Sequence, residues 1–81
     1  MNDEQIIEVI TRMFREVFDD ESMVITGSTS QEDIEEWDSL SHLRIILLLE
    51  KEFGIKFDID RVGSLTSVGS IVQEVRNLVR R

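Results

Sequence analysis

The segment from residue 38 to residue 54 constrains the fold more than any other part of this chain. Its apolar residues recur at the spacing of an α-helix, and Gly54 stands where such a helix would end. On a helix with about 100° per residue they occupy two separate arcs. The first arc is Ile45, Ile46, Leu49 and Phe53, and the second arc is Leu40, Leu43 and Leu47. Such a helix is either buried nearly all round or has one face in the core and the other at an interface.

The length of the chain gives weight to the interface alternative. Its 81 residues are expected to form a single domain, residues 1–81. A domain of this size buries only ~60 % of its extended-chain surface, so little protein is left to cover both arcs. Periodicity alone leaves both alternatives open.

Two further segments have apolar residues at spacings of three and four, as amphipathic helices do. One covers about residues 3–18, with Asp3 as the expected N-cap. The other covers about residues 67–78, with Thr66 as the expected N-cap. Their apolar stripes are expected to form the core together with the helix at residues 38–54.

Shorter features connect these helices. Residues 19–37 are predicted to form a long first loop, with a helical turn near residues 31–35. Residues 58–62 are predicted to form one short helical turn before Gly63. The predicted fold is therefore all-α, a small bundle of three main helices and one short helix.

Composition argues against several classes of function. The net charge is −8, and residues 1–38 carry 12 acidic side chains against 2 basic ones, which argues against nucleic acid as a partner. The chain has no Cys, which removes thiol catalysis, and a single His, so no metal site is expected. No apolar run approaches the ~18 residues of a membrane span. The acidic N-terminus is unlike a secretory signal, so we expect a cytoplasmic protein.

Few side chains offer catalytic chemistry, and an enzyme is not expected. Ser39 and His42 lie three residues apart and could face each other on a helix, but a partly buried polar role for His42 is the better interpretation. Trp37 is either a core residue or an exposed recognition residue, with the core as the default. The acidic runs 19–21 and 58–60 lack the spacing of a calcium loop and are interpreted as solvated turns.

Ser39 itself allows two interpretations. A serine in the first turn of a helix is often a capping residue. The same position also favours an attached phosphate, because a helix N-terminus presents unpaired N–H groups and the positive end of the helix dipole. The patch formed by Leu40, Leu43 and Leu47 would then be available to a modifying enzyme.

The run Glu36-Trp37-Asp38-Ser39-Leu40 resembles the acyl carrier proteins, and with residues 50–57 and 65–68 the resemblance covers essentially the whole chain. It implies a four-helix bundle with a long first loop and a short third helix. It also implies that Ser39 carries 4′-phosphopantetheine, transferred from coenzyme A by a phosphopantetheinyl transferase, with Asp38 as part of the motif. The thiol of this arm would hold acyl groups as thioesters for acyl-loading and acyl-processing enzymes.

The resemblance also bears on partners and pathway. Residues expected to recognise partners are Trp37, Leu40, Leu43, Arg44, Leu47 and Glu50. Ser41 and Arg44 stand where carriers of primary fatty acid synthesis usually have acids, and Trp37 before Asp38 is similar to stand-alone carriers of specialised pathways, such as polyketide, peptide or modified-lipid synthesis. We therefore expect a free-standing, monomeric carrier of a specialised pathway. A peptidyl carrier and an unmodified acidic interaction module remain as alternatives.

Overall fold

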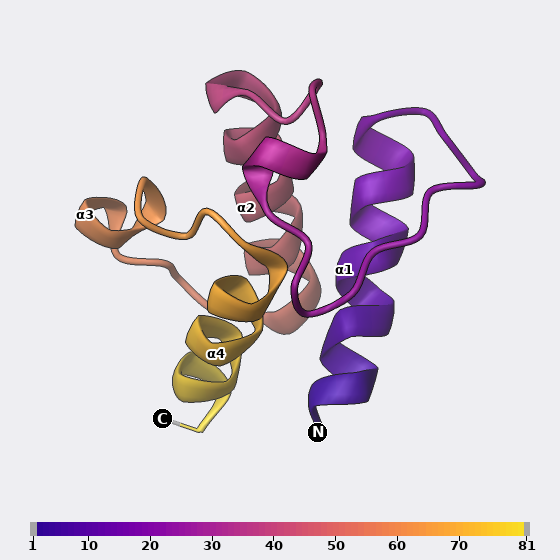
Figure 1. The fold of residues 1–81 in the computed structure, drawn as a ribbon. Helices are drawn as coiled ribbons and strands as arrows, with labels where there is room; N and C mark the ends of the chain where they lie inside the picture. The colour runs from indigo at the N-terminus through magenta and orange to yellow at the C-terminus, as the bar shows by residue number, and fades with distance from the viewer. Residues whose placement is uncertain (1, 81) are drawn as a thin grey trace.

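The computed structural model describes residues 2–80, which form four α-helices and one short 3-10 turn. The helices are α1 (Asp3–Val17), α2 (Ser39–Phe53), α3 (Ile59–Val62) and α4 (Val68–Val79), and the 3-10 turn is Gln31–Asp33. In Figure 1, α1 runs upward while α2 and α4 run downward, and α1 packs against both of them. The short α3 lies to one side of these three helices. The all-α prediction, with its short third helix and long first loop, is confirmed.

The core lies between the three main helices and is made almost entirely of aliphatic side chains. Its largest fully buried members are Phe14, Ile6, Ile10, Ile45, Leu49, Ile71, Val68 and Val75. Trp37 closes the upper end of this core, where its ring meets the Phe14 ring edge to face at a centroid distance of 4.9 Å. None of the helices in residues 2–80 is long and apolar enough to cross a membrane.

The start of α1 differs from the prediction by one residue. Asn2, and not Asp3, is the N-cap: its side chain accepts a hydrogen bond from the Gln5 backbone N–H at 2.9 Å. The Gln5 side chain accepts one in return from the Asn2 backbone N–H at 3.0 Å, which completes a capping box. Asp3 lies inside the first turn, where its carboxylate accepts a hydrogen bond from Arg76 of α4 at 2.7 Å. The cap prediction was wrong because Asn and Asp are nearly equal caps and the Gln5 partner selects Asn2.

The start of α4 is also shifted by one residue from the prediction. Ser67, and not Thr66, is the N-cap, and its hydroxyl accepts a hydrogen bond from the Ser70 backbone N–H at 3.1 Å. The Thr66 carbonyl is used elsewhere, since it accepts a hydrogen bond from the Gln31 backbone N–H at 2.9 Å. A contact with a distant loop therefore sets the boundary of this helix.

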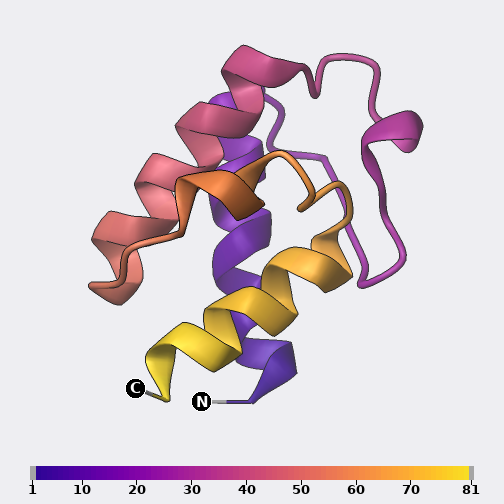
Figure 2. The same ribbon diagram turned by 90° about the vertical axis from the view of Figure 1, so that its left-hand side faces the viewer.

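The same contact belongs to a short seam that fixes the first loop to the start of α4. Besides the Gln31 bond, the Val68 N–H donates to the Thr29 carbonyl at 2.8 Å and the Gly69 N–H donates to the Gly27 carbonyl at 2.9 Å. A Cβ atom at Gly69 would lie 2.7 Å from the Gly27 carbonyl oxygen, so only glycine fits here. Figure 2 shows the loop descending to α4 before it returns to the start of α2. The long loop is thus an ordered part of the fold.

Candidate functional site

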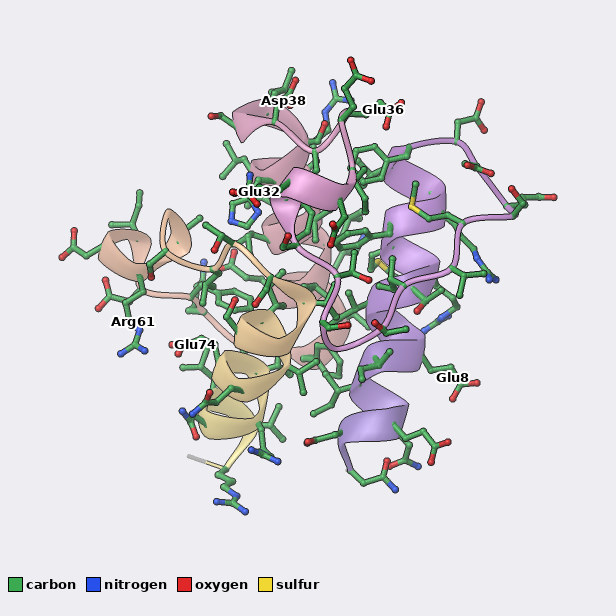
Figure 3. The ribbon with its side chains drawn as sticks, viewed as in Figure 1. Glu8, Glu32, Glu36, Asp38, Arg61 and Glu74 are labelled. Carbon is green, nitrogen blue, oxygen red and sulfur yellow. The ribbon has the colours of Figure 1, made fainter. Side chains whose placement is uncertain are left out.

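The N-terminus of α2 is the candidate site, and Asp38 forms its cap. The Asp38 carboxylate accepts a hydrogen bond from the Ser41 backbone N–H at 2.9 Å. This bond from the backbone N–H holds the pKa of Asp38 below its usual value. Glu36 and Asp38 both lie at the upper end of the molecule in Figure 3, whereas both ends of the chain lie at the lower end in Figure 1. Asp38, the first residue of the segment predicted to be helical, is thus the N-cap of α2.

Ser39 is the first residue of α2, and its side chain is exposed. Because Asp38 already caps the helix, Ser39 is not needed for that purpose, and the capping interpretation of Ser39 is wrong. Within residues 2–80 the Ser39 hydroxyl has no hydrogen-bond partner, unlike the neighbouring Ser41 hydroxyl, which donates to the Glu36 carbonyl at 3.0 Å. The hydroxyl therefore faces solvent beside the free N–H groups of the first turn, where an anionic substituent is stabilised.

His42 does not activate Ser39. Its Nδ1 accepts a hydrogen bond from the Trp37 indole N–H at 2.9 Å, and its Nε2 lies 2.8 Å from the Val62 carbonyl oxygen. With both ring nitrogens engaged, the imidazole has no lone pair left to take a proton from a serine. The structure supports a polar structural role for His42 and places it deeper than the partly buried position expected, with 7 % of its surface exposed.

Trp37 lies in the core, with 3 % of its surface exposed. Its ring contacts Phe14 and its indole N–H is held by His42, so its side chain cannot meet a partner protein. The expectation that Trp37 takes part in partner recognition is therefore wrong, and the default interpretation as a core residue is confirmed. The resemblance placed it beside the motif serine, but the backbone turn before α2 directs its side chain inward.

The two arcs of α2 have opposite environments. Leu49 on the first arc is fully buried, while Leu40, Leu43 and Leu47 on the second arc are 61 %, 48 % and 55 % exposed. We call these three residues the leucine face. The helix is therefore buried on one side only, which decides between the two alternatives left open by the periodicity. The second arc is thus an exposed apolar row on the surface of a small domain.

The two charged residues expected to recognise partners also differ in exposure. Arg44 is exposed on α2 between Leu43 and the buried Ile45, so it is available to a partner. Glu50 is half-buried, and its carboxylate accepts a hydrogen bond from the Phe57 backbone N–H at 2.8 Å. Glu50 therefore fixes the segment after α2, a role that its sequence position gave no sign of. Among residues 2–80 no three His, Cys, Asp or Glu side chains gather as a metal site would require.

A shallow hollow of about 330 Å³ adjoins Ser39. The residues that line it come from the first loop, α2 and the end of α3: Gln31, Ser39, His42, Leu43, Val62 and Gly63. Its wall combines apolar side chains with hydroxyl, amide and imidazole groups. This chemistry fits a pantetheine arm, which alternates short alkyl segments with amides and begins at a phosphate on the serine.

Comparisons with known proteins agree with this geometry. The solution NMR structure of a holo acyl carrier protein from Geobacter metallireducens superimposes with a TM-score of 0.82 and 42 % sequence identity, over 91 % of this chain and 85 % of that chain. An acyl carrier protein homolog from Mycoplasma genitalium is 41 % identical over 44 residues, which are 54 % of this chain and 52 % of that protein. The match thus spans about half the length of the curated relative. No family model matches the chain.

The structural neighbour is similar over nearly the whole chain in both sequence and fold, and the curated relative supports the same assignment. The holo form of that neighbour carries the prosthetic group that acyl carrier proteins bear. The chain belongs to the acyl carrier protein family, whose members are phosphopantetheine-bearing carriers and not enzymes.

Proposed function

We propose that this protein carries acyl groups as thioesters on a 4′-phosphopantetheine arm attached to Ser39, and that residues 1–81 act as one carrier domain. The observation that supports the proposal best is the exposed Ser39 hydroxyl, which starts α2 without a partner of its own because Asp38 caps the helix. The holo form of the structural neighbour supports the same chemistry.

The attachment is a group transfer in which the chain supplies the nucleophile. The Ser39 oxygen attacks the phosphorus of coenzyme A that bears pantetheine, and a phosphodiester bond forms. The phosphoanhydride bond breaks, adenosine 3′,5′-bisphosphate leaves, and the hydroxyl proton passes to a base of the phosphopantetheinyl transferase. The free N–H groups of the first turn of α2 stabilise the new anionic phosphodiester. The thiol of the arm then supplies the thioester chemistry that a chain without Cys lacks.

The proposed docking surface for the transferase and for acyl-loading and acyl-processing enzymes is the leucine face, with Arg44 beside it. Its exposed apolar area lies directly after Ser39 along α2, so an enzyme that holds α2 by this face reaches the serine. We propose a monomeric carrier that works in the cytoplasm, where coenzyme A and the transferase would meet it.

The attachment is tested by incubating the protein with coenzyme A, Mg²⁺ and a broad-specificity phosphopantetheinyl transferase and measuring the intact mass. We expect a gain of one phosphopantetheinyl group in the unmodified sequence and in Ser41→Ala, and no gain in Ser39→Ala. Ser41→Ala is the matched control because it removes a nearby hydroxyl that is engaged with the Glu36 carbonyl. No gain in the unmodified sequence would overturn the proposal and favour an unmodified interaction module.

The proposed pathway is a specialised one, because the positions just after Ser39 lack acids. Ser41 is neutral and Arg44 is an exposed cation, so a basic patch on an enzyme would meet a like charge there. The holo-protein should be loaded more slowly by a transacylase of primary fatty acid synthesis than that system's own carrier is. Ser41→Asp combined with Arg44→Glu should restore loading. Equal loading of the unmodified sequence would contradict a specialised pathway, and loading only by an adenylating enzyme with an amino acid would identify a peptidyl carrier.

A further inference from the structure

Trp37, His42 and Val62 form a hydrogen-bonded relay through the start of α2. An indole N–H can only donate, so the Nδ1 atom of His42, at 2.9 Å, must be the acceptor. A neutral imidazole has one acceptor and one donor nitrogen, so Nε2 carries the hydrogen and donates to the Val62 carbonyl at 2.8 Å. The relay therefore requires one tautomer of neutral His42.

The relay holds a helix that has limited packing of its own. α3 is four residues long and has no fully buried residue: Val62 packs partly buried against the core, while the Ile59 side chain is 84 % exposed. Two side-chain links join the helix to its neighbours: the His42 bond to Val62 on the α2 side, and the ion pair of Arg61 with Glu74 of α4 at 3.1 Å. Figure 3 shows Arg61 and Glu74 close together below α3. Loss of the His42 bond removes the link that faces Ser39.

His42 also lies in the lining of the hollow beside Ser39. Val62 and Gly63, at the end of α3, line that hollow together with Ser39 and Leu43 of α2. His42 lines it too and is within 2.8 Å of the Val62 carbonyl oxygen through Nε2. This one side chain therefore joins the α2 part of the lining to the α3 part.

We propose that His42 is a positioning residue whose neutral form holds α3 against α2 beside Ser39 and whose protonation releases it. A protonated imidazole carries hydrogens on both nitrogens, so Nδ1–H would face the Trp37 N–H with no acceptor between them, in a site that is 7 % exposed. Of the three groups in the relay only the imidazole can take up a proton, so the relay responds to pH through His42 alone. The consequence for the arm rests on the proposed attachment at Ser39, whereas the relay itself does not.

In the part of the chain that the structure describes, no charged group near His42 is placed to stabilise its protonated form. Within residues 2–80 no carboxylate oxygen lies within 4.0 Å of a His42 ring nitrogen, since the ion pairs of this region join other residues. The charged side chains on the 3-10 turn, the link to α2, the first half of α2, and α3 with its cap are Glu32, Asp33, Glu35, Glu36, Asp38, Arg44, Asp58, Asp60 and Arg61. Asp38 accepts a hydrogen bond from Ser41, and Arg61 forms an ion pair with Glu74. The residue of α1 that contacts Trp37 is the apolar Phe14. Protonated His42 therefore gains no anionic partner in exchange for the lost acceptor.

The chain is well suited to a direct test, because it has one Trp and one His. In NMR spectra of the unmodified apo-protein, the His42 ring nitrogens report the tautomer and the Trp37 indole N–H reports the bond. When the pH is lowered from 7.5 far enough to protonate His42, we expect both signals to change together with one shared midpoint. Over the same range the Val62 and Gly63 amides should lose about tenfold in protection from hydrogen exchange, after correction for the intrinsic rate.

Two variants separate positioning from a purely structural role. His42→Gln offers a carbonyl to Trp37 and an amide to Val62 without titrating, so it should keep α3 protected at both pH values. His42→Leu cannot form either bond and should show the unprotected α3 at both pH values. Should His42→Leu fail to fold, Arg61→Gln serves instead: it cuts the link to α4 and should leave the pH transition of Trp37 intact.

The link to the site is measured as the rate of arm transfer to the unmodified sequence divided by the rate for His42→Gln at the same pH, which cancels the pH dependence of the transferase. We expect this ratio to change at least twofold between the same two pH values, before and after protonation of His42. Absence of the shared NMR transition would overturn the relay and leave the proposed function untouched. A transition with a constant rate ratio would overturn the positioning role. No arm transfer at any pH would overturn the proposed function and leave the relay standing.

Discussion

The two apolar arcs of α2 are chemically alike and structurally opposite. Leu47 and Leu49 are two residues apart, yet Leu47 is half-exposed and Leu49 is fully buried against the core. The difference arises because α1 covers one side of α2, while the other main helix, α4, packs against α1 rather than over the leucine face. Hydrophobicity therefore did not decide which leucines are buried; the number of helices available to cover them did. What remains uncovered is free to serve a partner.

The largest effect is expected on the buried arc. Leu49→Ala should lower the free energy of unfolding by about 2–5 kcal/mol, because it removes a fully buried side chain and leaves a cavity between α2 and the core. Chemical denaturation followed by circular dichroism measures this loss, and an equal loss for Leu47→Ala would show that the two arcs do not differ as the structure indicates.

A smaller effect is expected at the end of α2, where Glu50 was predicted to recognise partners. Glu50→Ala should cost about 1–2 kcal/mol of stability, because the Phe57 N–H loses a charged acceptor in a half-buried position. Glu50→Gln keeps an acceptor oxygen and should recover most of that loss. If Glu50→Ala has unchanged stability but the holo-protein is loaded more slowly, Glu50 recognises partners and does not stabilise the fold.

The leucine face should show the reverse pattern. Leu43→Ala and Leu47→Ala should each change the free energy of unfolding by less than about 1 kcal/mol, because surface substitutions seldom do more. Both variants should nevertheless slow arm transfer to Ser39, measured at substrate concentrations well below saturation. Ile59→Ala is a matched control, since Ile59 is also highly exposed but lies on α3, outside this face. Normal rates in both leucine variants would remove the docking role.

The smallest effect is expected at Asp38, where both arcs begin. The hydrogen bond from the Ser41 backbone N–H lowers the pKa of the folded Asp38, so the charge of Asp38 contributes stability above the ordinary aspartate pKa of ~3.9. That contribution is lost as the pH falls through the lower folded value. Asp38→Asn retains a capping oxygen but not the charge, so its small stability deficit at pH 7 should shrink as the pH falls through that lower value. A deficit that stays constant through the whole titration of Asp38 would assign the effect to the geometry of the cap and not to its charge.

Much of the fold was predictable because it depends on local patterns. The three apolar stripes predicted α1, α2 and α4 to within one or two residues, and Gly54, at φ 65°, ends α2 in the left-handed region that favours glycine. The Asp38 cap was predictable for the same reason, since capping involves residues only three apart. The hypothesis that Ser39 carries the arm depended on the sequence motif as well as on the predicted start of the helix. The structure adds that the Ser39 hydroxyl does not cap α2, because Asp38 does.

What the sequence by itself determined is the set of helices, the position of Ser39 at the start of α2 and the existence of two apolar arcs. Only the tertiary structure decided which arc is buried, why Trp37 faces inward, and that His42 joins Trp37 to the Val62 carbonyl twenty residues further along the chain. It also decided the start of α4, through the bond between Gln31 and Thr66. Helix formation follows from side-chain spacing within a few residues. Burial and hydrogen-bond pairing depend instead on which distant segments of the chain come into contact. The same sequence pattern is compatible with several different sets of such tertiary contacts.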